Sequence, residues 1–172
     1  MLKPIYKILY LIPIVLLMAF MPAQNNRQSR FKSVVDSAAS ISQIEKQAFD
    51  LVNAHRKRIG LEPLVNKDYI AEQARLHSKD MADGKVEFGH DGANARLDNI
   101  SKSLKEMRAG GENVFYCTDN YDNLAGTAVD AWLKSPGHRE NIEGDYNLSG
   151  MGVVRAANGD YYFTQIFVKG NE

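Results

Sequence analysis

The chain has 172 residues, a length typical of one soluble domain. Its 44% hydrophobic and 24% charged residues are ordinary globular composition, which argues against a disordered or fibrous protein. Lys+Arg and Asp+Glu both number 21, so the chain has no surplus of positive charge that would favour nucleic acid as a partner. Its single cysteine, Cys117, excludes a disulfide framework or a thiolate zinc cluster.

The first residues have the pattern of an export signal. Lys3 and Lys7 form a basic start, and residues 8–21 are an uncharged apolar run, shorter than the about 20 residues that a membrane-spanning helix needs. Ala23 is a small residue at a plausible cleavage point. We therefore expect a signal peptide over residues 1–23 and a secreted or extracytoplasmic protein. The alternative is an uncleaved signal anchor, which would be the only attachment to a membrane.

The next segment is polar, and helical periodicity begins after it. Residues 24–42 show no sustained apolar pattern, which predicts a linker before a folded domain at residues 43–172. The spacing of apolar residues in the domain then predicts helices over residues 43–59, 67–83, 93–104 and 121–133. A further short helix is expected to begin at Ser135-Pro136, with Ser135 as its N-cap, and to end at Gly144.

The last part of the chain has strand character. Residues 150–156 and 161–168 flank Asn158-Gly159, a pair that favours a two-residue hairpin turn. Apolar residues occupy both faces of the second strand, which is typical of a sheet covered on both sides. Several helices and such a sheet predict an α/β fold, namely a three-layer α/β/α sandwich with a mostly antiparallel central sheet.

Short motifs follow one another in a characteristic order along this domain. They are Leu51-Val52-Asn53 with Arg56, Ala74-Arg75 with His77-Ser78, Phe88-Gly89-His90, Gly111-Glu112-Asn113-Val114, Ser135-Pro136-Gly137-His138-Arg139 and Gly150-Met151-Gly152-Val153. This ordered set resembles the CAP superfamily (cysteine-rich secretory, antigen 5 and pathogenesis-related 1 proteins), in its bacterial exported branch. The resemblance covers roughly residues 43–168 and supports the three-layer fold.

The resemblance also implies a solvent-open cleft, lined in many members by two histidines and two acids that in some of them bind zinc or another divalent cation. Carried over by position, His90, Glu112 and His138 match the two histidines and the first acid. Ser135 stands where the second acid normally lies, so this chain departs from the full set of four. The expected cleft residues are therefore His90, Glu112, Ser135 and His138.

The chemistry of these side chains is compatible with a metal site. Two imidazoles and one carboxylate are enough protein ligands for zinc, with a fourth position open to water or a ligand. From spacing alone, however, His90, Glu112 and His138 are more simply three unrelated surface residues, because nothing local forces them together. At the start of a helix, the His138 ring should stay neutral, which is the form that binds metal.

Other reactive side chains are expected to be structural. His77 lies on the apolar stripe of its helix and is predicted to be a hydrogen-bonded core histidine, and we assign His55 no chemistry. Cys117 is predicted to be a small buried residue. Arg139 and Asn141 are expected to tie the wall of the cleft together.

Two functions remain open at this stage. The first is a non-enzymatic exported binding module for a lipid, peptide, cell-wall component or partner protein, with zinc or another divalent cation as the only expected cofactor. The alternative is a metal-assisted hydrolase, a peptidase or esterase, in the same cleft. The missing second acid removes an obvious general base, and the Ser135 hydroxyl would need a base of its own. We therefore favour the binding module and assign no catalytic residue.

Overall fold

The computed structural model describes residues 22–118 and 121–172, with side chains from Ser40 onward. The expected signal peptide thus lies outside the described residues except for its last two positions. The elements, in chain order, are α1 (Pro22–Arg58), β1 (Val65–Asn66), α2 (Asp68–Ala82), α3 (Ala93–Ser101), β2 (Glu106–Cys117), α4 (Leu124–Lys134), α5 (Pro136–Glu143), β3 (Leu148–Arg155) and β4 (Tyr161–Asn171).

Helix α1 begins well before the expected start of the domain. The chain divides into two compact units, residues 1–36 and 37–172, and α1 contributes to both. The segment 24–42, which we expected to be a linker, is therefore helical, and its last six residues belong to the second unit. It contains neither glycine nor proline, so nothing in its sequence interrupts a helix. None of the described helices is both long and apolar enough to cross a membrane.

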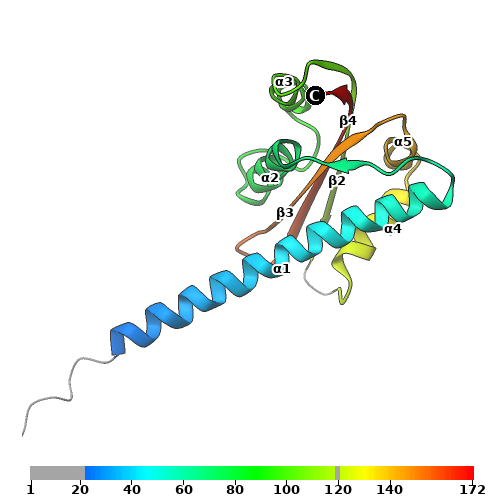
Figure 1. The fold of residues 1–172 in the computed structure, drawn as a ribbon. Helices are drawn as coiled ribbons and strands as arrows, with labels where there is room; N and C mark the ends of the chain where they lie inside the picture. Colours follow the sequence, from blue (N-terminus) through cyan, green and yellow to red (C-terminus); the bar gives the residue numbers. More distant parts are fainter. Residues whose placement is uncertain (1–21, 119–120) are drawn as a thin grey trace, which may run out of the picture. The chain divides into compact units, whose positions relative to one another are not determined.

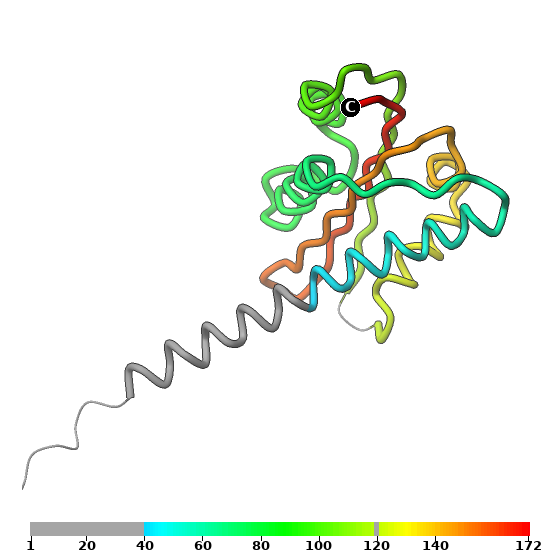
Figure 2. The backbone as a smooth tube through the Cα atoms, viewed as in Figure 1, coloured from blue at the N-terminus to red at the C-terminus, as the bar shows by residue number. Residues whose placement is uncertain are grey.

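The sheet has four strands in the order β1-β3-β4-β2. Strand β4 pairs antiparallel with β3 on one side and with β2 on the other, and only the short β1 is parallel to its neighbour. Figure 2 shows these long strands running side by side through the second unit. The expectation of a mostly antiparallel sheet is confirmed.

Strand β4 separates two hydrophobic clusters, because its side chains alternate between the faces of the sheet. Phe163 and Phe167 pack with residues of α1, α4 and α5, including the fully buried Trp132. Ile166 and Val168 point the other way and pack with residues of α2 and α3. The second unit is therefore a three-layer α/β/α sandwich, as the sequence predicts, with α2 and α3 on one side of the sheet and α4 and α5 on the other (Figure 1).

Helix α2 lies unusually close to β3. A Cβ atom added at Gly150 would stand 2.1 Å from the backbone nitrogen of Ala71, and one at Gly152 would stand 2.2 Å from that of Arg75. No side chain fits at either position. The glycines of the Gly150-Met151-Gly152-Val153 motif therefore set the distance between helix and sheet.

Two local expectations need correction. Helix α4 begins at Leu124 instead of residue 121, because the side chain of Asn123 accepts a hydrogen bond from the Gly126 N–H and caps the helix. The β3–β4 hairpin does not have a two-residue turn. Ala156 donates to the Asp160 carbonyl, and Gly159 takes a φ of +98° in the left-handed region, which closes a longer loop.

Candidate functional site

Glu112 is the centre of the candidate site. It lies in β2 on the face of the sheet that α2 and α3 cover, and its side chain is only 5% exposed. The three groups nearest its carboxylate come from three different segments: Arg96 from α3, His90 from the loop between α2 and α3, and His77 from α2. A buried carboxylate needs such partners, because burial of an unpaired charge is strongly unfavourable.

Arg96 binds both oxygens of this carboxylate. Its Nε donates to Glu112 Oε2 at 2.8 Å and its Nη2 donates to Oε1 at 2.7 Å, which is the two-pronged geometry that suits a guanidinium. A third donor, Nη1, reaches the carbonyl of Asp91 at 2.8 Å. Arg96 was missed by the sequence analysis, and it closes an ion pair at the floor of the site.

His90 is the exposed member of the cluster. Its Nδ1 lies 3.0 Å from Glu112 Oε1, and its side chain is 51% exposed. An ionised carboxylate can only accept, so Nδ1 carries the proton, and in the neutral ring Nε2 keeps a free electron pair. Glu112 therefore fixes the orientation of the His90 ring.

His77 is the buried histidine that the sequence predicts. Its Nε2 lies 2.8 Å from the carbonyl of Gly89 and donates to it, while Glu112 Oε1 is 3.9 Å away. Burial lowers the pKa of His77, and the hydrogen bond to Gly89 opposes this effect. The ring is therefore neutral at neutral pH, and it anchors the loop that carries His90.

His138 lies in the first turn of α5. Burial lowers the pKa of His138, and the nearby His90 lowers it further. The direction agrees with our expectation, although the cause is burial rather than the helix N-terminus. Ser135 is the N-cap of α5 and Gly144 its C-cap, as the sequence predicts, although the Ser135 side chain makes no capping hydrogen bond.

Two asparagines hold α5 against β2. Asn113 Nδ2 donates to the carbonyl of His138 at 2.9 Å. Asn141 Nδ2 donates to the carbonyl of Glu112 at 3.1 Å and to Asn113 Oδ1 at 2.8 Å. The expected structural role of Asn141 is confirmed, and these bonds place the His138 turn beside the strand that carries Glu112.

The donors do not fit a three-ligand metal site as they stand. Among the described residues, no group of three histidine, cysteine or acidic side chains is arranged to hold a metal ion. Both Glu112 oxygens are bound by Arg96, and His77 uses Nε2 for Gly89. Zinc binding by His90, Glu112 and His138 stays a prediction.

Aromatic side chains form a row near His90 and Glu112. Phe88, two residues before His90, is 54% exposed, and its ring centroid lies 6.2 Å from that of Tyr116, which is 42% exposed. Tyr116 in turn lies 5.0 Å from Tyr162 across the β2–β4 pair. Tyr116 and Glu112 are four residues apart in one strand and share a face of the sheet. We call Phe88, Tyr116 and Tyr162 the aromatic row.

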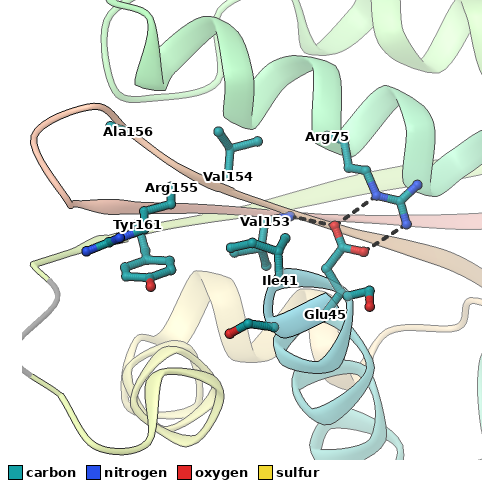
Figure 3. A pocket seen from close by; sticks show the side chains of 10 residues that line it. Ile41, Glu45, Arg75, Val153, Val154, Arg155, Ala156 and Tyr161 are labelled. Carbon is teal, nitrogen blue, oxygen red and sulfur yellow. Dashed lines mark hydrogen bonds and ion pairs between the residues drawn. The ribbon is translucent and has the colours of Figure 1, made fainter. Parts of the chain in front are cut away.

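A separate hollow lies between α1, α2 and the β3–β4 hairpin (Figure 3), with a volume of about 780 Å³. Its polar feature is an ion pair in which Arg75 Nε and Nη2 donate to the two oxygens of Glu45, each at 2.8 Å. Glu45 Oε1 also accepts the backbone N–H of Val153 at 2.9 Å. This arrangement joins three elements, and none of the predicted site residues lines it.

Comparison with known proteins adds a family to this geometry. The sequence profile of the cysteine-rich secretory protein family matches residues 49–167. In Bacillus subtilis, the uncharacterized membrane protein YlbC is 36% identical over 129 residues, and the uncharacterized protein YkwD is 30% identical over 138 residues. These alignments cover 73% and 79% of this chain but only 34% and 51% of the relatives.

A solved structure agrees with the fold. The crystal structure of an extracellular protein containing an SCP domain from Bacillus anthracis matches with a TM-score of 0.59 and 30% identity. The match covers 74% of this chain and 41% of that one. The chain thus corresponds to one part of longer proteins.

Proposed function

Because the chain belongs to the cysteine-rich secretory protein family, we propose that it is an exported binding module that holds its ligand at the cleft around Glu112. The observation that carries the proposal is the state of Glu112, whose two oxygens are both bound by Arg96. Location outside the cytoplasm is supported by the basic and apolar start of the chain and by the Bacillus anthracis relative, which is described as extracellular.

The geometry of Glu112 favours binding over hydrolysis. A general base must be within hydrogen-bond reach of the proton that it removes, with an oxygen available to accept it. Here Oε1 already accepts from Arg96 and His90, and Oε2 accepts from Arg96. Three of the about four acceptor positions of the carboxylate are thus taken, and the arginine charge makes Glu112 a weaker base toward a substrate water.

The side chains that could serve as nucleophiles support the same conclusion. Ser78 is fully buried, and its hydroxyl lies within hydrogen-bond distance of the Gly152 carbonyl and of Thr164. Burial raises the pKa of Cys117 to about 11, so the thiol stays protonated at neutral pH. Neither residue is an activated nucleophile.

The aromatic row supplies the contact surface that a binding module needs. Exposed aromatic side chains next to a polar cleft are typical of binding surfaces, because they offer large apolar area on stiff side chains. Phe88 lies in the same loop as His90, and Tyr116 lies in the same strand as Glu112. A ligand could therefore contact the histidines with its polar groups and the aromatic row with its apolar part.

The first experiment is native mass spectrometry of the protein purified from its own source. We expect a bound non-covalent ligand that is retained by a Tyr121→Ala variant and lost or reduced in Phe88→Ala and Tyr116→Ala variants. Tyr121 is a matched control, because it is a 49% exposed aromatic residue outside the aromatic row. Equal retention in all of these variants would contradict the proposed site.

The second experiment tests the hydrolase alternative. The purified chain is assayed against a panel of peptide and ester substrates, with and without zinc. We expect no turnover above that of a Glu112→Gln variant. Turnover that disappears in this variant would show that the protein is an enzyme.

A further inference from the structure

We infer that the guanidinium of Arg96 supplies the positive charge that neutralises Glu112, and that it thereby keeps Glu112 from serving as a metal ligand. The role expected for Glu112 then changes from ligand to support for the His90 ring. The inference rests on the proposed function in treating this cleft as the ligand site. Its test uses zinc alone and needs no natural ligand. Failure of this inference can therefore be told apart from failure of the proposed function.

Arg96 and Glu112 form a largely buried ion pair. Their side chains are 12% and 5% exposed, and two of the guanidinium nitrogens bind the two carboxylate oxygens. Buried pairs of this geometry are hard to open, because removal of either partner leaves an uncompensated charge. The bond from Arg96 Nη1 to the Asp91 carbonyl further limits movement of the guanidinium.

A metal ion bound to Glu112 would compete with Arg96 and His90 for space and would be repelled by the Arg96 charge. Zinc bound to a carboxylate oxygen lies about 2.0–2.2 Å from it, within the space that the N–H donors of Arg96 and His90 now share. A divalent ion there would also stand beside the guanidinium charge, and like charges at such short distance repel strongly when water is excluded. The ion would have to displace Arg96 or bind at the one remaining lone pair, on Oε2, directly beside the guanidinium charge.

The imidazole of His90 is not blocked by Arg96 in the way that the Glu112 carboxylate is. His90 donates from Nδ1 to Glu112, which leaves the Nε2 electron pair of the half-exposed neutral ring free of this bond. A carboxylate that accepts from the far nitrogen of a histidine is a common second partner of metal-binding histidines, because it fixes the ring. A divalent cation bound by His90 would therefore be held through Nε2, with Glu112 hydrogen-bonded to the other nitrogen of the ring.

The experiment is calorimetric titration of the full chain with zinc at pH 7.5, using four proteins: wild type, Arg96→Gln, Glu112→Gln and the double variant. Arg96→Gln should bind zinc at least about tenfold more tightly than wild type, because it releases Glu112. Glu112→Gln alone should weaken zinc binding by no more than the about 10–100-fold that loss of the second partner of a metal-binding histidine costs. The double variant should lose the gain, since the released ligand is gone.

Arg108→Gln is the matched control for charge. Arg108 also lies on β2, but its side chain is half exposed, and its Nε is 3.8 Å from a carboxylate oxygen of Glu106. Removal of this charge should leave zinc affinity unchanged. A gain as large as that of Arg96→Gln would mean that net charge, and not the release of Glu112, explains the result.

Two results would overturn the inference. One is a zinc affinity of Arg96→Gln equal to or below that of wild type, with circular dichroism showing that the variant is folded. The other is a loss of well over about a hundredfold in Glu112→Gln, which would make Glu112 a wild-type ligand and not only the second partner of His90. The second result does not depend on Arg96→Gln, so the inference remains testable if that variant fails to fold.

Discussion

Arg56 shows how a single buried side chain can organise a large part of this domain. It is 2% exposed, and its guanidinium donates to backbone carbonyls, namely those of Glu62, Ile142, Gly144 and Tyr146, at 2.7–3.2 Å. Burial lowers the pKa of Arg56, and the field of Asp145 acts in the opposite direction. The Arg56 of the sequence motif thus joins the end of α1 to the segment that follows α5.

We predict that Arg56→Lys destabilises the protein by about 2–4 kcal/mol, because one ammonium cannot reach the same carbonyls and several are left unpaired. Urea unfolding followed by circular dichroism measures this change. Lys57→Met, at the exposed neighbouring position, should change the free energy of unfolding by less than about 0.5 kcal/mol. A similar small effect for Arg56→Lys would contradict the structural role.

The histidines should make stability depend on pH. Burial lowers the folded-state pKa of both His77 and His138 below the ordinary 6.5. As pH falls through about 6.5, the unfolded chain takes up protons that the folded chain does not, so stability decreases. The groups facing His77 are the Gly89 carbonyl, Arg96, Glu112 and His90.

We therefore predict a fall in melting temperature between pH 7.5 and pH 5.5, and a smaller fall in His77→Gln. Glutamine does not titrate in this range and can still donate to a carbonyl. Some pH dependence should remain, because His138 still titrates. The acids with a lowered pKa, namely Asp83, Asp145 and Glu172, lose their contributions at lower pH, outside this window. An unchanged slope in His77→Gln would contradict the assignment.

The sequence predicted some residue roles better than others. His77 and Cys117 were placed correctly in the core, because an apolar stripe and a strand end are local patterns. Arg96 was not found, since an arginine in a weakly apolar helix is expected to face solvent. Its partner Glu112 lies 16 residues away on a strand, and periodicity carries no information about such a pairing.

At the scale of elements, the double-sided apolar pattern of β4 was enough to predict the layers. The ends of elements were less predictable, because single hydrogen bonds decide them. The side chain of Asn123 caps the start of α4. In the hairpin, the N–H of Ala156 donates to the carbonyl of Asp160, so the loop closes around the residues between these two and not as a two-residue turn. The contact of α2 with β3 could not be predicted either, although the glycines that permit it stood out in the sequence.

We predict that Gly150→Ala and Gly152→Ala each destabilise the protein by about 3 kcal/mol or more, since the added methyl group meets helix backbone that cannot rotate away. Thermal or urea unfolding measures the loss. Gly137→Ala is the control, because a Cβ there has nothing within 4 Å, and alanine in α5 should be neutral or stabilise by up to about 1 kcal/mol. Wild-type stability in both variants would mean that the helix lies farther from the sheet.

At the scale of the whole molecule, the curated relatives are longer than this chain, which spans 34% and 51% of their lengths. Their names include a membrane protein, while the Bacillus anthracis protein is described as extracellular.

We predict export with removal of the leader. Intact-mass measurement of the extracytoplasmic fraction should show a chain that begins near Gln24, because the short apolar run and Ala23 fit a cleaved signal. Recovery of the uncleaved chain in the membrane fraction would favour the anchor instead.

The bond between Glu45 and Val153 has a consequence for self-association. In the described residues, β1 pairs with β3 only at Leu148 and Ser149, so the rest of that strand lies at the border of the sheet. A border strand with free N–H groups can recruit a strand from another copy and seed aggregates. Here the carboxylate of Glu45 already accepts the Val153 N–H, and an intruding strand would have to displace a buried charge that Arg75 neutralises. We therefore expect the ion pair that joins two helices to the sheet also to oppose pairing of this border strand with another copy of the chain.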